Sequence, residues 1–235
     1  MFDRLKEWIN RKLTGPDAHH DLQHLPAPKV AGDQPLEDLR LIVLDLETTG
    51  LNPAKDQVIA IGAVAINRER IPLRDQFDLV LKRPELDISE TVLIHGIGPE
   101  ALVKGHEIED ALLYLLEWMN GDPILAFHSA FDQKFLEKTL KQTLGYTQSH
   151  TWMDVADLLP AMFPKAKPPE GRLDNWADHF GLEVSERHHA AADAMATAEL
   201  TLIALNRARK SDVHTLAQLQ DKLRYYHRLK TFSRH

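Results

Sequence analysis

Residues 39–47 (LRLIVLDLE) constrain the fold of this chain more than any other stretch. Five apolar side chains lie between Leu41 and Leu46, which is typical of a buried strand in the middle of a sheet. Asp45 and Glu47 interrupt the run two residues apart, so both side chains lie on the same face of the strand. A carboxylate at the end of a buried strand costs free energy unless its burial is compensated. This segment therefore predicts a central strand that carries a functional site.

The segments that follow predict a mixed sheet. Residues 57–66 (QVIAIGAVAI) alternate and are β-rich, and residues 77–82 (FDLVLK) follow a charged turn, so we expect antiparallel neighbours. A short buried strand is expected at 123–129, and a strand end that leads into a helix at 152–163. Apolar periodicity predicts further helices at 108–120, 131–145, 172–182, 190–208 and 212–230. Strands first, and then strands alternating with helices, indicate an α/β fold whose mixed central sheet is covered by helices on both faces.

Composition excludes several classes of protein. The 235 residues include 43% hydrophobic side chains, enough for a packed core, and no cysteine, which rules out disulfides and thiolate metal sites. No apolar run approaches the roughly 18 residues that span a bilayer, and the charged first residues lack the apolar stretch of a secretory signal. We therefore expect a cytoplasmic protein that has no membrane partner.

The net charge of −7 is distributed unevenly along the chain. Residues 206–235 contain eight Lys or Arg and two Asp, so they carry +6 while the remaining residues carry −13. Divalent ions bound to acidic groups would cancel part of the negative charge. The basic tail is either a solvated helix face or a surface that contacts phosphates.

Three regions are expected along the chain. Residues 1–36 predict an N-terminal helix (1–14) and a linker or extended segment (15–36) that is rich in Pro, Gly, His and Asp. Residues 37–206 contain the strands, the helices and the candidate site, and form the central domain. Residues 207–235 predict a basic C-terminal helix with one apolar seam made of Leu216, Leu219, Leu223 and Tyr226. Either terminal helix could pack on its own domain or dock to a partner.

Three further residues complete a candidate metal centre. Asp132 follows a short strand and opens a helix, Asp193 falls on the first turn of the Ala-rich helix, and His188 falls on the loop before that helix. Carboxylate oxygens are the ligands that Mg²⁺ and Mn²⁺ prefer. A neighbouring histidine can accept a proton from water near neutral pH. Ligands of mixed sheets gather at strand ends, where we expect Asp45, Glu47 and Asp132.

Each part of this set has an ordinary explanation when it is taken alone. Asp-x-Glu occurs often at solvated strand edges, Asp132 could simply cap its helix, and Asp193 is favoured by the helix dipole. The hydroxyls and N–H groups of Thr48 and Thr49 could contact a substrate or only satisfy their turn. The combination, in this order, favours a metal-dependent nuclease.

Three motifs carry a family resemblance. Residues 44–51 (LDLETTGL), 128–136 (HSAFDQKFL) and 188–194 (HHAAADA) resemble the exonuclease motifs of the DEDDh 3′→5′ exonucleases. This is the superfamily of the proofreading epsilon subunit of bacterial DNA polymerase III, RNase T and oligoribonuclease. Residues 94–97 (IHGI) resemble a substrate-side motif, and the resemblance covers about residues 41–205. One departure is His128, which stands where family members commonly carry Asn.

The resemblance implies a ribonuclease-H-like fold and a two-metal mechanism. Two Mg²⁺ or Mn²⁺ ions would be held by four carboxylates, those of Asp45, Glu47, Asp132 and Asp193. His188 would deprotonate the attacking water, and nucleoside 5′-monophosphates would leave from the 3′ end. The resemblance also implies a set of substrate-binding residues: Leu46, Thr48, Thr49, His95, Ile97, His128 and Phe131. For Ile97 and Phe131, packing in the core is the alternative.

The substrate and the partners are less determined. A single-stranded 3′ end is the expected substrate, with DNA as the first expectation and short RNA as the alternative, because the chemistry at phosphorus is shared. A second hypothesis is a nuclease fold that acts mainly as a subunit or scaffold, docking to a polymerase or another protein through its terminal helices. The intact set of five site residues favours the enzyme.

Overall fold

The computed structural model describes residues 22–86, 88, 92–166, 168, 171–184 and 187–232. Within them lie the strands β1 (Arg40–Thr48), β2 (Val58–Asn67), β3 (Gln76–Val80), β4 (Ile124–Ala126) and β5 (Trp152–Asp154). The α-helices are α2 (Val92–His95), α3 (Pro99–Lys104), α4 (Ile108–Met119), α5 (Ala130–Leu144), α6 (Val155–Met162), α7 (Leu173–Phe180), α8 (Ala190–Arg209) and α9 (Leu216–Phe232). Two short 3₁₀ turns, η1 (Leu22–His24) and η2 (Leu36–Asp38), precede β1.

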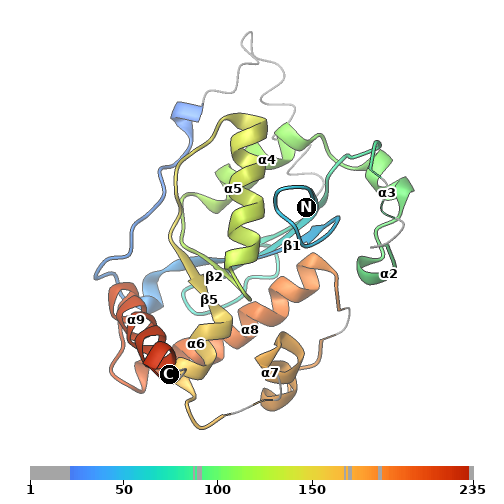
Figure 1. The fold of residues 1–235 in the computed structure, drawn as a ribbon. Coiled ribbons are helices and arrows are strands. Elements are labelled where there is room, and N and C mark those ends of the chain that lie inside the picture. The colour runs from blue at the N-terminus through green and yellow to red at the C-terminus, as the bar shows by residue number, and fades with distance from the viewer. Residues whose placement is uncertain are drawn as a thin grey trace.

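The five strands form one mixed sheet in the order β3-β2-β1-β4-β5 (Figure 1). β1 pairs antiparallel with β2 along its whole length, and β2 pairs antiparallel with β3. β4 runs parallel to β1 on the other side and pairs in turn with β5. The predictions of a mixed sheet, of β1 as its central strand and of antiparallel β2 and β3 are confirmed.

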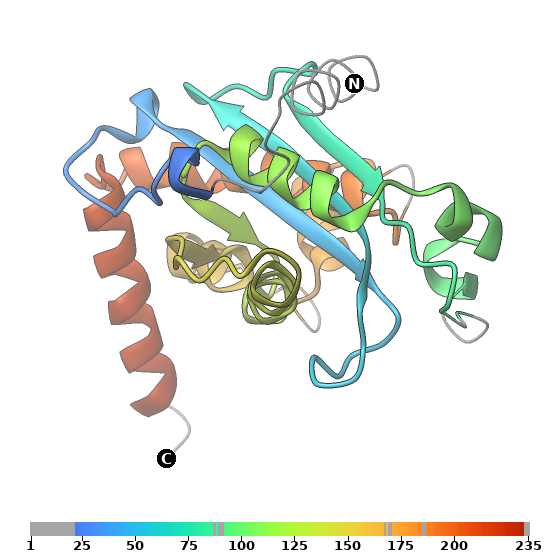
Figure 2. The ribbon, with the colours of Figure 1, turned by 90° about the horizontal axis from the view of Figure 1, so that it is seen from above.

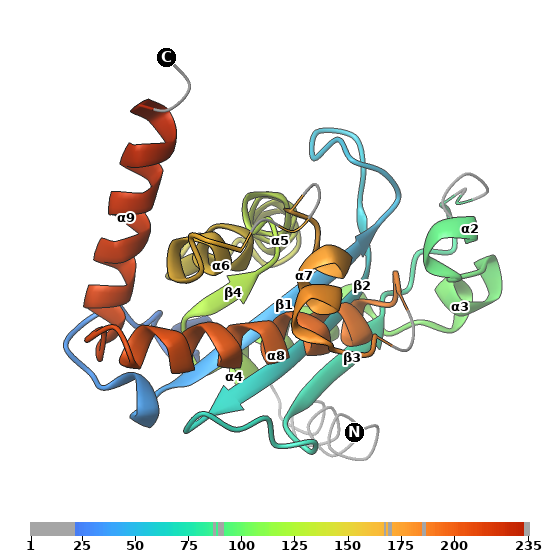
Figure 3. The same ribbon diagram turned by 90° about the horizontal axis from the view of Figure 1, so that it is seen from below.

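Alternate side chains of β1 enter two separate hydrophobic clusters. Leu41 and Val43 belong to a cluster formed with α6, α8 and α9, whereas Ile42 and Leu44 belong to one formed with α4 and α5. Figures 2 and 3 show the layering, because α4 lies in front of the strands in one view and α8 in the other. Helices therefore cover both faces of the sheet, as predicted. Asp45 shares the face of Leu41 and Val43, the face that α8 covers.

Most of the predicted helices are found at the predicted positions. α5 ends at Gly145, whose φ of 68° is the left-handed conformation that glycine adopts without steric cost. The sequence patterns did not predict α2 and α3, which have only four and six residues. Helices this short carry too few turns to show a periodic apolar pattern.

The segment before β1 lies on the domain. The backbone N–H of Lys29 donates to the carbonyl of Gly121, and Pro35 forms a β-bridge with Thr215. The buried carboxylate of Asp122 accepts from both Lys29 and Arg40, which ties this segment to the start of β1. For residues 22–36 the expectation of an extended segment on the domain is confirmed. The helix expected at residues 1–14 lies outside the described residues.

α9 packs against the domain through its predicted seam. Leu216, Leu219 and Leu223 are buried in the same cluster as Leu41, and Tyr226 is half-buried. α8 extends to Arg209, so the end of the long helix lies beyond residue 206. None of the helices in the described part of the chain has the length and hydropathy that crossing a bilayer requires.

Candidate active site

The two carboxylates of β1 lie inside the strand, and the expectation that they stand at its end was wrong for Asp45. β1 continues to Thr48, and Asp45 pairs with Gly62 of β2. On the other side, β4 pairs only with Ile42 and Val43. The second half of β1 therefore has no strand partner on that side, since β4 is short. Asp45 is partly exposed although the strand continues beyond it.

Gly62 brings the third carboxylate to this strand. A Cβ atom at Gly62 would lie 2.1 Å from the carbonyl carbon of Ala190 and 2.2 Å from the backbone nitrogen of Ala191. Only glycine permits this approach between β2 and the first turn of α8. Since Gly62 is the β-partner of Asp45, the start of α8 lies directly beside Asp45. Asp193, on the first turn of α8, reaches the cluster for this reason.

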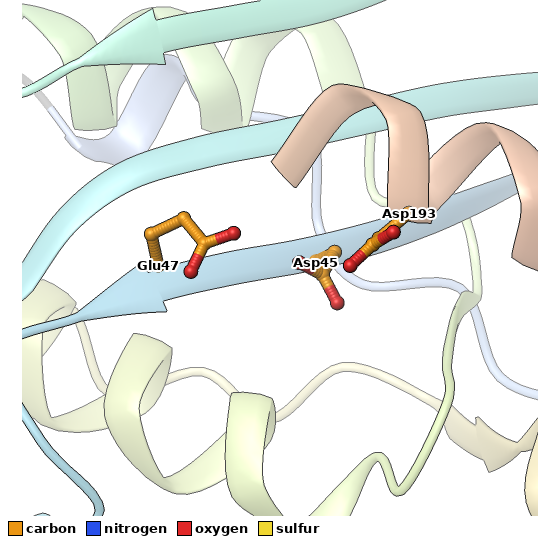
Figure 4. Close-up of side chains that lie close together, drawn as sticks. All are labelled: Asp45, Glu47 and Asp193. Carbon is orange, nitrogen blue, oxygen red and sulfur yellow. The ribbon is translucent and has the colours of Figure 1, made fainter. Parts of the chain in front are cut away.

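The carboxylates of Asp45, Glu47 and Asp193 form a compact cluster (Figure 4). One oxygen atom of each lies within 4.8 Å of those of the other two. Figure 4 shows Asp45 and Asp193 pointing toward one another from β1 and α8, with Glu47 farther along the same strand. Three oxygen ligands at this spacing suit a hard divalent cation.

Asp132 joins the site from the other face of the sheet. It is 3% exposed on the first turn of α5, and its Oδ1 accepts from the backbone N–H of Leu46 at 3.1 Å. The bond spans 86 residues of sequence and links α5 to the uncovered edge of β1. Capping alone does not account for Asp132, because its carboxylate is held against another element.

Crowding and burial perturb all four carboxyl groups. Burial, and then the charges of Asp132 and Asp193, raise the pKa of Asp45 well above its usual value. Burial and the charge of Asp193 raise the pKa of Glu47 to about 8. Burial raises the pKa of Asp132 to about 8 against the opposing backbone hydrogen bonds, with a further contribution from Asp154. Such a group of carboxylates is stable in ionised form only beside cations.

One cation from the chain already faces this cluster. The guanidinium of Arg187 forms ion pairs with Asp193 and with Asp174 of α7. Burial raises the pKa of Asp193, and the adjacent Arg187 acts in the opposite direction. The charge of Arg187 also acts on Asp45 and Glu47. Our sequence analysis missed Arg187, although its position directly before His188 was a usable signal.

His188 lies on the loop before α8, as predicted. Its φ of 62° is left-handed, its backbone N–H donates to Asp193 Oδ2 at 3.2 Å, and its side chain is exposed. The structure therefore brings the backbone of His188 to the cluster and leaves its ring at the rim. His128 is also exposed, and its backbone N–H donates to Asp154 Oδ1 at 3.0 Å. Asp154, the N-cap of α6, is a second acidic residue near Asp132 that sequence analysis missed.

The turn after β1 uses its hydroxyl groups internally. Thr48 donates to the carbonyl of Gly50 at 2.7 Å, and Thr49 donates to Asp56 Oδ1 and accepts from the backbone N–H of Gln57. These bonds support the alternative in which the threonines satisfy the turn. Leu46 is 5% exposed, so its side chain belongs mainly to the core, while its N–H binds Asp132.

The IHGI segment is folded back on itself. His95 is buried, and its Nδ1 accepts from the backbone N–H of Ile97 at 3.1 Å. Nε2 then carries the proton, and it has no hydrogen-bond partner among the described residues. Ile97 is 9% exposed in a small cluster with Ile59 and Leu102, which favours core packing.

Two other apolar side chains of this segment are exposed. Leu93 is 92% exposed and Ile94 is 56% exposed, both on α2, which sequence analysis did not predict. Phe131 is half-buried and packs on Phe135 with ring centroids 4.7 Å apart, consistent with its place in the core.

Comparison with known proteins gives the family. The exonuclease family model, RNase_T, matches residues 42–201, more than half of the chain. A PolC-type DNA polymerase III from Thermotoga maritima is 30% identical over 222 residues. The match covers 94% of this chain and 16% of the polymerase, so the chain spans only a small part of that relative.

Two solved structures show the same fold. E. coli Exonuclease I in complex with a dT13 oligonucleotide aligns with a TM-score of 0.63 and 21% identity, over 73% of this chain and 42% of that one. The zinc-bound form of the E. coli ExoI–ssDNA complex aligns with a TM-score of 0.62 and 20% identity, over 74% and 42%. The matched residues 42–201 include all three motif segments, and the chain belongs to the DEDDh family of 3′→5′ exonucleases, with an α/β, ribonuclease-H-like fold.

Proposed function

We propose that this protein is a metal-dependent exonuclease that removes nucleotides from the 3′ end of single-stranded nucleic acid, DNA in particular. The carboxylate cluster carries the proposal, because Asp45, Glu47 and Asp193 present oxygen atoms within 4.8 Å of one another. Asp132 approaches the same stretch of β1 through Leu46. A purely structural role gives no reason to crowd four carboxyl groups whose pKa values are all raised.

The donor set fits two divalent cations. Asp45, Glu47 and Asp193 would hold one Mg²⁺ or Mn²⁺ ion, and Asp45 with Asp132 would hold the second. Bound there, such ions stabilise the charge that develops on the attacking and leaving oxygens of an in-line displacement. A metal in this fold is supported by the zinc-bound form of the ExoI–ssDNA complex.

The residues of the chain supply the proton transfers and the positioning. His188, at the solvent-facing rim beside Asp193, would take a proton from the attacking water. The water oxygen forms a bond to the terminal phosphorus while the bond from phosphorus to the 3′ oxygen of the preceding nucleotide breaks. That 3′ oxygen accepts a proton, and a nucleoside 5′-monophosphate is released. The glycine-permitted contact of α8 with β2 keeps Asp193 and the His188 loop beside Asp45.

The terminal nucleotide would lie between β1 and α2. On one side, the cluster is bordered by Leu46, Thr48 and Thr49. The hydrogen bonds of the two threonines within their turn would hold this side of the site in place before substrate binds. His95 offers Nε2–H as a donor.

The opposite side of the cluster, near Asp132, is bordered by His128 and Phe131. Ile97, which follows α2 in the chain, would anchor that helix through its buried side chain. The exposed side chains of Leu93 and Ile94 on α2 would contact a base.

DNA is the proposed substrate because of what relatives bind. Exonuclease I was solved with a dT13 oligonucleotide, and the PolC-type relatives are DNA polymerases. The PolC-type relatives also support a polymerase or another protein as a partner of this chain. We further propose that the protein acts in the cytoplasm, on ends that are already single-stranded.

The test uses 5′-labelled single-stranded DNA and RNA of the same sequence, with Mg²⁺, with Mn²⁺ and with EDTA. We expect a ladder that shortens from the 3′ end, faster on DNA, and absent in EDTA. Asp45→Asn should abolish it, because the variant removes the ligand shared by both metal positions. Asp78→Asn is the matched control, since Asp78 is exposed on β3, two strands away.

The proposed base has an adjacent control in the chain. His188→Gln should slow cleavage by about 10²- to 10⁴-fold, the usual contribution of general base catalysis. His189→Gln should retain activity, because the side chain of His189 is exposed and its contact with the first turn of α8 is made by its backbone carbonyl. Full activity in EDTA would refute the metal-dependent mechanism. A folded protein that cleaves neither strand would favour the scaffold hypothesis.

A further inference from the structure

α9 presents a second face that the domain does not cover. Its buried seam consists of Leu216, Leu219 and Leu223. On the opposite side of the helix, Tyr225, Arg228 and Phe232 follow one another at steps of three and four residues, so they form one line. Tyr225 is 52% exposed and Phe232 is 78% exposed. We call these three residues the α9 stripe.

The stripe alternates aromatic rings with a positive charge. Arg228 has no ion-pair partner among the described residues. Elsewhere on α9, Arg224 pairs with Asp221 and Lys230 pairs with Asp157. The two exposed rings and the unpaired guanidinium between them are not used in packing α9 on the domain, because the packing side of the helix is the leucine seam. They match the combination that binds single strands, in which rings stack on bases and cations contact phosphates.

Contacts connect α9 to the edge of the active site. Lys230 donates to Asp157 Oδ1 at 3.0 Å, and His227 Nε2 lies 3.5 Å from Asp157 Oδ2, so the second half of α9 is held against the first turn of α6. The N-cap of α6 is Asp154, whose charge acts on Asp132. Figures 2 and 3 show α9 and the turn after β1 projecting from the same side of the fold.

The charge of this region favours a polyanion over a protein surface. Residues 206–235 carry +6, whereas the rest of the chain carries −13. A nucleic acid that enters an acidic site needs a cationic surface to offset repulsion from the body before the metal ions are reached. The stripe lies in this cationic region, beside the element that borders the site.

We propose that the α9 stripe is an upstream binding site for single-stranded nucleic acid. Tyr225 and Phe232 stack on bases, and Arg228 contacts the phosphate between them, while the 3′ end of the same strand occupies the carboxylate cluster. The inference takes its substrate from the proposed exonuclease activity. It goes beyond that activity because it assigns affinity for the part of the strand that is not being cleaved.

The first measurement is binding without cleavage. A labelled single-stranded DNA of about 16 nucleotides, within the length that one domain covers, is titrated in EDTA and followed by fluorescence anisotropy at several salt concentrations. We expect Tyr225→Ala and Phe232→Ala each to weaken binding at least about fivefold, the lower end for a lost base stack. Arg228→Gln should reduce the magnitude of the salt slope by about 0.7, the value for one single-strand phosphate.

The second measurement compares substrate lengths. The ratio of kcat/KM for the long strand to kcat/KM for a trinucleotide should fall in the stripe variants, because a trinucleotide cannot reach α9 and the cluster together. Arg74→Gln is the matched control, since Arg74 is an exposed cation in the turn between β2 and β3. Thermal melting checks the fold, and the exposed stripe variants should melt as the wild-type protein does.

The outcomes separate this inference from the proposed function. Wild-type affinity, salt slope and length ratio in all three variants would overturn the α9 site. If the variants instead dissolve an oligomer in sedimentation while strand affinity is unchanged, the stripe is a protein interface and the inference is also overturned. If the wild-type protein cleaves nothing but loses strand affinity in the stripe variants, the α9 site stands and the proposed activity fails.

Discussion

We expect the ionised carboxylate of Glu47 to destabilise the metal-free protein, so that replacing Glu47 by glutamine makes that state more stable. Burial and Asp193 raise the pKa of Glu47 from 4.5 to about 8. A carboxyl group whose pKa is higher in the folded state contributes stability that is present below pH 4.5 and lost as the pH rises toward 8. The folded protein must then hold an ionised carboxylate beside other carboxylates, whereas the unfolded chain holds it in water.

The magnitude follows from the shift. Each pKa unit corresponds to about 1.36 kcal/mol, so a rise to about 8 amounts to roughly 5 kcal/mol when the group is fully ionised. Glu47 is half-buried, and solvent screening reduces the expected gain of Glu47→Gln to about 2 kcal/mol at pH 8. The gain should be much smaller at pH 5, because the folded protein keeps the proton and this pH lies only slightly above the ordinary pKa of 4.5. With saturating metal ion, the wild-type protein should instead be more stable than Glu47→Gln, because it has one more carboxylate ligand for the metal.

Urea unfolding in EDTA between pH 5 and pH 9, repeated with excess Mg²⁺, measures both effects. Glu37→Gln serves as the control, since Glu37 is exposed on the η2 turn at the opposite end of β1. The reasoning is refuted if metal-free Glu47→Gln is no more stable than the wild-type protein at pH 8. It is equally refuted if the difference does not grow with pH.

Three structural predictions concern positions outside the cluster. Gly62→Ala should cost about 1–3 kcal/mol in urea unfolding and should also impair cleavage, because its Cβ would meet the backbone of Ala190; wild-type activity would contradict the assigned role. Leu219→Ala, at a fully buried position, should cost about 2–5 kcal/mol, and a negligible cost would mean that α9 is not packed. Asp122→Ala should cost about 1–3 kcal/mol, because Arg40 loses one of its two carboxylate partners and keeps Asp75; thermal melting would show a matching drop.

Local sequence patterns predicted the helices and strands and most of the candidate site residues. The apolar run of β1 predicted a central strand because a strand buried on both faces excludes polar residues, apart from those with a function. The two-residue spacing of Asp45 and Glu47 placed both on one face, since side chains of a strand alternate. The five-residue spacing of His188 and Asp193 predicted a loop and a first helical turn, as observed.

Some features of the site depend on contacts between distant segments. Local periodicity does not report that Asp132 binds the N–H of Leu46, 86 residues away. Local periodicity also could not show that β1 continues beyond Asp45 without a partner on one side. That unpaired edge exists because β4 is short and pairs only with Ile42 and Val43. The burial of Ile97 likewise depends on its packing against β2 and α3. Short helices such as α2 leave no periodic signal, so the exposure of Leu93 and Ile94 appears only in the structure.

The sequence by itself therefore predicted the order of the strands and helices along the chain, the residues of the candidate site and the family of the protein. It could do so because these depend on side-chain type and on spacing within single elements. The tertiary structure decided how the elements meet: Gly62 admits α8 to β2, Arg187 faces the carboxylates, and one side of α9 remains exposed. These features arise from close packing in three dimensions, where residues far apart in the chain exclude or contact one another.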